Sequence, residues 1–238
     1  MSDSQSSPPK YLDIITAFFV TVVIVSNIAS SAKIVDLGFS VFGIRMAFDG
    51  GTLLFPIVYI LGDVLTEVYG FKAARRVIWT GFAALALTVL VLFVLRILPP
   101  EAIWEASVGN TAYNSVLGGM STGGIALASL LAYFTGEFVN SVLLSRIKVL
   151  MKGKHLWIRA IGSSIAGELL DTFIFILAAT ITGVFPRNLF LSLVLTNYLL
   201  KLSIEVLVLP ITYKTVRYLK KRENIDHYDI GITYRPIG

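Results

Sequence analysis

Six long apolar stretches, separated by shorter polar segments, dominate the hydrophobic pattern of the chain. Each is close to the ~20 apolar residues that a helix needs to cross a bilayer. Proline marks several edges, as at Pro99-Pro100 after the third stretch and at Pro186 after the fifth. The pattern predicts six transmembrane helices, at residues 11–31, 51–69, 77–98, 123–144, 158–184 and 189–213.

The composition also indicates a membrane protein. Of 238 residues, 55% are hydrophobic and 15% are charged, and the mean hydropathy is +0.78. The first apolar stretch is too long for a cleavable signal peptide and is expected to be retained. We therefore predict an all-α polytopic membrane protein with a polar N-terminal tail (1–10), a six-helix transmembrane domain (11–213) and a basic C-terminal tail (214–238).

The positive charges are distributed unevenly between the two sides of this topology. Fifteen of the 20 Lys and Arg residues lie in the N-terminal tail, in the connections at 70–76 and 145–159, and in the C-terminal segment. The positive-inside rule therefore places both termini in the cytoplasm. Topology and attraction to anionic headgroups account for the pI of about 9.4 without any direct binding of nucleic acid.

Residue types that often carry catalysis are rare. The chain has no cysteine, which excludes disulfides and thiolate metal sites, and its two histidines lie in predicted cytoplasmic segments. Rhomboid-type and zinc proteases need histidine inside the membrane. An intramembrane aspartyl enzyme is a weaker alternative: Asp63 and Asp171 lie on separate spans and can in principle meet, but the Gly-x-Gly-Asp pattern of that class is absent, because Ile60 stands at the first glycine. The sequence predicts no enzyme, no metal site and no cofactor, and favours transport or binding of a small polar solute.

Polar residues nevertheless occur inside five of the six predicted spans. They recur every three or four residues, so each set lies on one helix face and can point into the bundle. The third span has no ionisable residue before Arg96. The residues are Asn27 in the first span, Tyr59, Asp63 and Glu67 in the second, Tyr133, Glu137 and Asn140 in the fourth, Ser164, Glu168 and Asp171 in the fifth, and Asn197, Lys201 and Glu205 in the sixth.

Carboxylates outnumber cations in this set, six to one. A charge at the bilayer centre costs at least ~2.5–3.5 kcal/mol on insertion scales. Lys201 can neutralise only one carboxylate, so the others must be protonated, hydrated or bound to a ligand rich in hydrogen-bond donors. The excess of acid therefore favours a binding site over a purely structural core.

Structural roles stay open for part of the set. Glu67 and Glu205 lie near span ends, where they can reach headgroups or pair with the cations Arg75, Arg76 and Lys214. The three asparagines can form interhelical hydrogen bonds, and the two tyrosines can be packing residues. Asp63, Glu168, Asp171 and Lys201 are harder to explain in this way, because an intramembrane charge cluster is costly.

Segments from all parts of the chain carry a family signature. They are "SNIASSAK" in the first span, "FPIVYILGDVLTEVYGFKAARRVIW" in and after the second, "AYFTGEFVNSVLLSRIK" in the fourth, "IGSSIAGELLDTFIF" in the fifth, "NYLLKLSIEVLVLP" in the sixth, and "DHYDIGITYRP" in the tail. In this order they resemble the queuosine precursor transporter family, formerly described as vitamin uptake transporters.

The resemblance implies a bacterial inner-membrane importer of 7-cyano-7-deazaguanine and 7-aminomethyl-7-deazaguanine. It also implies a six-helix bundle similar to the substrate-binding subunits of energy-coupling-factor transporters. Many such subunits dock an ATPase through an Ala-x-x-x-Ala motif, which residues 11–31 lack. We therefore expect the chain to act alone. The alternative is a substrate-binding subunit, for a vitamin or nucleobase-like solute, that needs a separate ATPase.

The chemistry of a 7-deazaguanine suggests roles for the polar residues. Glu168 or Asp171 is expected to accept its two adjacent N–H donors, and Lys201 or Asn197 to donate to O6. An aromatic ring is expected to stack on its flat face. The remaining residues of the expected pocket are Asn27, Glu137, Asn140 and either Tyr59 or Tyr133.

Asp63 and Glu67 are expected to form the gate through which the substrate leaves the pocket toward the cytoplasm, next to the basic turn that contains Arg75 and Arg76. Either Asp63 or Glu67 can also carry a proton. Proton-coupled import and facilitated diffusion both remain open. So does the oligomeric state, because the small residues of the first span suit a homodimer and the packing of a single bundle equally well.

Overall fold

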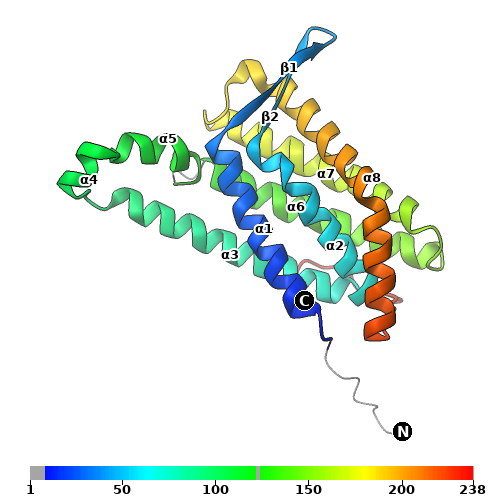
Figure 1. The fold of residues 1–238 in the computed structure, drawn as a ribbon. Coiled ribbons are helices and arrows are strands. Elements are labelled where there is room, and N and C mark those ends of the chain that lie inside the picture. Colours follow the sequence, from blue (N-terminus) through cyan, green and yellow to red (C-terminus); the bar gives the residue numbers. More distant parts are fainter. Residues whose placement is uncertain (1–8, 122–123, 238) are drawn as a thin grey trace.

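The computed structural model describes residues 9–121 and 124–237, which form a helical bundle with one β-hairpin (Figure 1). In chain order the elements are α1 (Leu12–Ala32), β1 (Ile34–Val41), β2 (Ile44–Asp49), the 3₁₀ turn η1 (Gly50–Leu53), α2 (Phe55–Tyr69), α3 (Phe71–Ile97), α4 (Ala102–Ser107), α5 (Gly109–Ser121), α6 (Gly124–Leu150), α7 (Leu156–Ile181), the 3₁₀ turn η2 (Arg187–Leu189) and α8 (Phe190–Glu223).

Five segments of the described chain are long and apolar enough to cross a membrane, and they contain α1, α3, α6, α7 and α8. This confirms a polytopic membrane protein. The second predicted span instead forms α2, which has 15 residues. At 1.5 Å per residue α2 is about 22 Å long, shorter than the ~30 Å hydrocarbon core. Residue 123, where the fourth predicted span begins, lies outside the described residues.

Helix α2 lies inside the bundle. Twelve of its 15 residues are buried, and it packs against α1, α3, α6 and α8. Pro56 fits its first turn, where a missing N–H costs nothing. Because protein surrounds α2 on several sides, it can carry Asp63 and Glu67 without exposing them to lipid.

Two glycines allow α6 and α7 to approach closely. A Cβ at Gly136 of α6 would lie 2.7 Å from the Cβ of Asp171, and a Cβ at Gly167 of α7 would lie 2.9 Å from the Gly136 carbonyl oxygen. Only glycine fits such spacing, as in other close helix crossings in membranes. The contact brings the polar faces of α6 and α7 together.

The hairpin of β1 and β2 was not predicted and is an addition to the otherwise helical architecture. Phe42 and Gly43 connect the strands, and both have positive φ values, 50° and 78°. Such two-residue turns match the twist of antiparallel strands. The sequence analysis considered only the apolar stretches and missed this signal. It also missed the short helices α4 and α5, which connect α3 to α6.

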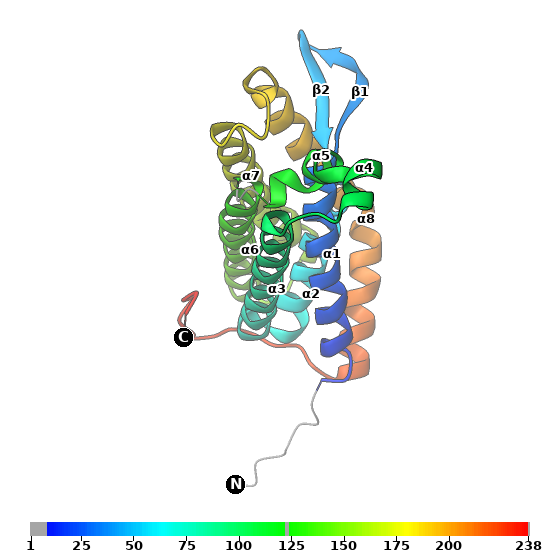
Figure 2. The ribbon, with the colours of Figure 1, turned by 90° about the vertical axis from the view of Figure 1, so that its left-hand side faces the viewer.

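Both ends of the described chain lie at the end of the bundle opposite the hairpin (Figure 2). The backbone N–H of Lys10 donates to Glu223 Oε2 at 2.9 Å, so the start of the chain contacts the last turn of α8. Helix α8 continues past residue 213 to Glu223. Residues 1–8 of the predicted N-terminal tail lie outside the described residues, as does residue 238 of the C-terminal tail.

Candidate functional site

Polar residues from four helices meet in the middle of the bundle. All of them are at most 3% exposed. We call this group the central cluster and define it as Tyr59 and Asp63 of α2, Glu137 and Asn140 of α6, Ser164, Glu168, Asp171 and Thr172 of α7, and Lys201 and Glu205 of α8.

Lys201 is the cation of the central cluster. Its Nζ pairs with Asp171 Oδ2 at 2.6 Å and donates to Thr172 Oγ1 at 3.2 Å. The same atom lies 4.6 Å from the centre of the Phe55 ring, which is a cation–π contact. A buried ammonium stays charged only with partners of this kind. Lys201 thus neutralises Asp171 and leaves the other carboxylates of the cluster to other groups.

A second set of hydrogen bonds runs across the cluster. Asn140 Nδ2 donates to Asp63 Oδ1 at 2.8 Å, and Ser164 Oγ donates to Glu205 Oε1 at 2.7 Å. Ser164 Oγ also lies 3.5 Å from Asn140 Oδ1. These contacts join α2, α6, α7 and α8. Glu205 is 2% exposed, so its alternative role as a residue that reaches headgroups is wrong.

Glu137, Glu168 and Tyr59 contribute polar atoms with no partner. Within the described residues, both carboxylate oxygens of each glutamate and the tyrosine hydroxyl are buried without a hydrogen bond. The Glu137 carboxylate lies against α2, where a Cβ at Gly62 would come within 2.7 Å of its Oε2. Buried polar groups are nearly always hydrogen-bonded. These orphan oxygens therefore mark the place in the bundle where a bound molecule or a proton is needed.

A separate polar site, centred on Asp49, lies at the hairpin end of the bundle. Asp49 Oδ2 accepts from Asn197 Nδ2 at 2.5 Å and from Thr52 Oγ1 at 3.0 Å, and its Oδ1 accepts from Ser30. The Asp49 backbone N–H donates to Asn197 Oδ1 at 3.3 Å. Asn197 therefore ties α8 to the hairpin. The sequence analysis missed Asp49 because it lies outside the apolar stretches, just before a Gly-Gly pair.

Asn27 and Tyr133 have partners outside the central cluster. The Tyr133 hydroxyl donates to the Ile78 carbonyl oxygen of α3 at 2.8 Å. Asn27 Nδ2 donates to the Val23 carbonyl oxygen of its own helix at 2.8 Å, and its Oδ1 is buried without a partner. The geometry of Tyr133 is that of a packing residue, whereas Asn27 still has one unused acceptor.

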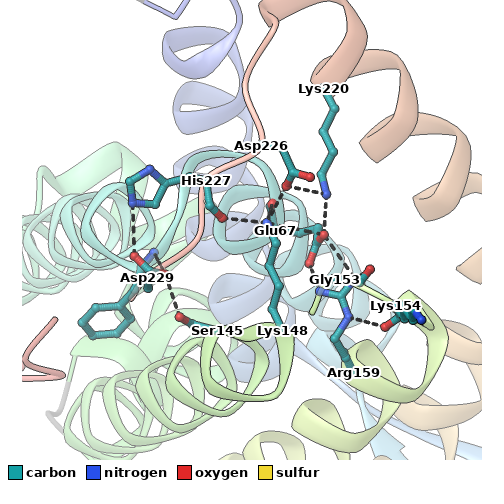
Figure 3. A network of polar contacts seen from close by, with 11 residues as sticks. Glu67, Ser145, Lys148, Gly153, Lys154, Arg159, Lys220, Asp226, His227 and Asp229 are labelled. Atoms are coloured by element: carbon teal, nitrogen blue, oxygen red, sulfur yellow. Dashed lines mark hydrogen bonds and ion pairs between the residues drawn. The ribbon is translucent and has the colours of Figure 1, made fainter. Parts of the chain in front are cut away.

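Glu67 occupies the end of the bundle near the termini and is 1% exposed, so it is not a boundary residue. Its carboxylate pairs with Arg159 of α7, with Lys220 of α8 at 2.5 Å and with Lys148 of α6 at 3.6 Å (Figure 3). Charges from three helices thus converge on α2. We call these four residues the Glu67 cluster.

Lys148 and Arg159 were counted in the sequence only as charges that set the topology. Both are buried, at 2% and 1% exposure. Lys148 and Lys220 also pair with Asp226, at 2.7 and 2.8 Å. Although partial burial opposes the shift, these hydrogen bonds lower the pKa of Asp226. Counting charges cannot separate a buried cation from one at the surface, so the sequence held no signal for this cluster.

The basic turn does not supply the cations that pair with Glu67. Arg75 Nη1 instead donates to the Arg235 carbonyl oxygen at 3.1 Å. Arg76 lines a surface pocket with Lys72 and His227. The expected pairing of Glu67 with Arg75 and Arg76 is therefore wrong, and both arginines lie beside the C-terminal segment.

The bundle is closed at both ends of the central cluster. The Asp49 site joins the hairpin to α1 and α8, and the Glu67 cluster joins α2, α6, α7 and α8. The central cluster therefore lies between two sets of polar contacts that hold the helices together. Within residues 9–121 and 124–237 no group of three or more acidic or histidine side chains is placed to hold a metal ion.

Long apolar helices around a buried, acidic interior define a polytopic membrane protein. Residues 49–215 match the family described as "Putative vitamin uptake transporter", and the chain belongs to this family. The resemblance inferred from the sequence segments is therefore confirmed. Because this is a family of transporters, membership favours transport over catalysis.

Curated relatives cover most of the chain. It is 28% identical over 174 residues to "Probable queuosine precursor transporter" of Bacillus subtilis (strain 168), which is 73% of each chain. It is 25% identical over 198 residues to "Queuosine precursor transporter" of Escherichia coli (strain K12), which is 82% of this chain and 84% of the relative. No solved structure matches the chain.

Proposed function

We propose that the chain imports a 7-deazaguanine precursor of queuosine across the bacterial inner membrane and needs no ATPase module. Membership in a transporter family and the names of its relatives support the substrate class. The observation that carries the proposal is the pair of buried carboxylates, Glu137 and Glu168, which have no donor of their own in the described chain.

The base offers the donors that these carboxylates lack. Its Watson–Crick edge has two adjacent N–H groups, which one carboxylate can accept together in charge-assisted hydrogen bonds. Asp171 is already paired with Lys201, so Glu168 is the better candidate for this edge. Glu137 then accepts a hydrogen bond from another polar group of the ligand, or pairs with the ammonium of an aminomethyl group.

Recognition of O6 falls to Lys201. Two of its three N–H donors go to Asp171 and Thr172, which leaves one for the ligand. Asn197 is a weaker choice, because both polar atoms of its amide are bonded to Asp49. Tyr59 is a better stacking partner than Tyr133, because its hydroxyl is unpaired and it lies within the cluster. Asn27 and Asn140 complete the proposed pocket.

Uptake by the purified chain in liposomes tests this function. Radiolabelled 7-cyano-7-deazaguanine should enter vesicles that contain this protein alone. Glu168→Gln and Glu137→Gln should each reduce uptake about 10- to 100-fold, since a hydrogen bond to a charged group contributes ~1.5–3 kcal/mol. Glu137→Gln removes no hydrogen bond within the described chain, so its melting temperature should stay close to that of the unmodified protein. Glu168 faces the Glu205 carboxyl group, so the melting temperature of Glu168→Gln is measured beside its uptake.

Glu105→Gln is the matched control, because Glu105 is exposed and lies on the short helix α4. It should transport normally. Normal uptake by both cluster variants would show that the site is misassigned. A large loss of stability in either variant would show instead that the carboxylate has a structural partner.

The alternative function is that of a substrate-binding subunit for an ATPase. Such a subunit should bind the ligand in liposomes yet transport nothing. Energy coupling is tested in the same vesicles: import that continues after the proton gradient is collapsed argues for facilitated diffusion, and import that stops argues that a carboxylate such as Asp63 carries a proton.

A further inference from the structure

We propose that residues 224–236, which we call the C-terminal strap, form the cytoplasmic gate of the transport path. In the closed state the strap covers the Lys148 side of the Glu67 cluster, and its detachment opens a route on that side from the central cluster to the cytoplasm. The inference rests on transport by this chain but not on the identity of the substrate.

The strap crosses the end of the bundle and contacts three helices besides α8 (Figures 2 and 3). The His227 backbone N–H donates to the Val68 carbonyl oxygen of α2 at 3.3 Å. Asp229 Oδ2 accepts from the Phe71 N–H of α3 at 2.8 Å and from Ser145 Oγ of α6 at 2.6 Å. One segment thus holds together the ends of helices that must separate for a solute to leave on this side.

The strap also completes the environment of Lys148. This ammonium donates to the carbonyl oxygen of Glu67, to Asp226 Oδ1 and to the carbonyl oxygen of His227, each at 2.7 Å. Two of the three acceptors belong to the strap. A buried ammonium that loses its acceptors must be hydrated. Detachment of the strap therefore exposes Lys148, which is buried in the closed state, to water.

Two features indicate that the strap can dock and release. One is its close contact at Gly70, where α3 begins, and the other is the bend at Asn224 where the strap leaves α8. Gly70, with φ of 82°, has no Cβ, and a Cβ there would overlap the His227 ring. Asn224 ends α8 in a left-handed conformation with φ of 53° and so forms a bend where the strap turns away from the helix. Beyond it the strap has no helix or strand, and most of its side chains are exposed. Polar contacts of this kind can exchange with water at low cost.

The gate is connected to the central cluster through the same helices. Glu67 follows Asp63 by one turn of α2, and Lys148 follows Asn140 by two turns of α6. Asn140 also bonds Asp63 across these two helices. Any separation of α2 from α6 at the cluster therefore strains the contacts of Lys148 with α2 and with the strap. Substrate binding and release of the strap are mechanically linked in this way.

Reversible cross-linking tests the gate in the full chain, which has no native cysteine. Lys72 and His227 line the same surface pocket, so Lys72→Cys and His227→Cys can be joined by a short bis-methanethiosulfonate reagent. Fixing the strap should reduce uptake to about a tenth or less, and reductant should restore it, as expected when opening of a cover is required for turnover. Each single-cysteine variant should be unaffected by the reagent. Full uptake in the cross-linked protein would overturn the proposal.

A second measurement needs no substrate. Ser141 is buried on α6 between Asn140 and Ser145, so Ser141→Cys reports on access from the cytoplasmic side. In inside-out vesicles, Asp226→Asn should speed the alkylation of this cysteine about tenfold or more, because it weakens the charge-assisted hydrogen bonds of Asp226 to Lys148 and Lys220. Asp36→Asn, at the hairpin end, should not. An unchanged rate would exclude the gate even if the protein imports 7-deazaguanines. A faster rate would support the gate even if those ligands are not imported.

Discussion

Replacing Lys201 by methionine leaves Asp171 buried opposite an apolar group. The lost contacts are an ion pair of 2.6 Å, a hydrogen bond to Thr172 of 3.2 Å and the cation–π contact with Phe55. Breaking one side of a buried ion pair costs ~3–5 kcal/mol, because the remaining charge keeps its desolvation penalty. For a chain of this size ~1 kcal/mol shifts the melting temperature by ~2–4 °C, so Lys201→Met should lower it by about 6–20 °C.

The double variant Lys201→Met, Asp171→Asn separates the structural role of this pair from its role in transport. With both charges removed, no buried charge is left alone, and most of the lost stability should return. Uptake should not return, because the proposed donor to O6 is still missing. Thermal unfolding in detergent and uptake in liposomes measure the two effects on the same preparation.

Lys214→Met is the matched control, because Lys214 lies on the same helix and is exposed. Its melting temperature should stay within about 2 °C of the unmodified protein. Two results would refute the reasoning. One is a Lys201→Met protein as stable as the parent, and the other is a double variant whose loss equals the sum of the two single losses.

Gly136→Ala should lower the melting temperature, since the added Cβ would press into α7 and overpacking costs ~1–3 kcal/mol. Gly162→Ala should not, because its Cβ would be 4.0 Å from the nearest atom. Asp49→Ala should destabilise the fold by ~1–3 kcal/mol in thermal unfolding, because it leaves buried donors unpaired. Asp36→Ala removes an exposed ion pair with Arg45 and an exposed hydrogen bond from the Gly38 N–H, and should leave the melting temperature nearly unchanged. Because hydrogen bonds lower the pKa of Asp226, the strap should stay docked from neutral pH to about pH 4 and detach only below it. Hydrogen exchange of the strap amides, corrected for intrinsic rates, measures this, and detachment near pH 6 would contradict it.

The sequence was sufficient to locate the helices of the bundle. Long apolar stretches form helices in a membrane because each stretch must satisfy its own backbone hydrogen bonds. The length of α2 was not predictable in the same way, because hydropathy does not show that neighbouring helices, rather than lipid, surround Phe55–Tyr69. The hairpin was missed because its residues belong to no apolar stretch.

The sequence analysis named every residue of the central cluster except Thr172, whereas their pairing was not predicted. Spacing along one helix determines which side chains share a face. It does not determine which residue of α7 meets Lys201, because that depends on the crossing of α7 and α8. The structure pairs Lys201 with Asp171 and leaves Glu168 unpaired. The position of Glu67 near the end of its predicted span likewise suggested a residue at the membrane boundary. In the structure it is buried and pairs with three cations.

The enclosure of α2 has a consequence for how the protein is made. This helix is short and carries two carboxylates, so its insertion from the translocon gains little from hydropathy alone. Its packing partners include α6 and α8, which both follow it in the chain. Lys220, which pairs with Glu67, is also part of α8. The polar helix α2 therefore reaches its final environment only after α8 has been synthesised, which makes assembly of the bundle a late, cooperative event.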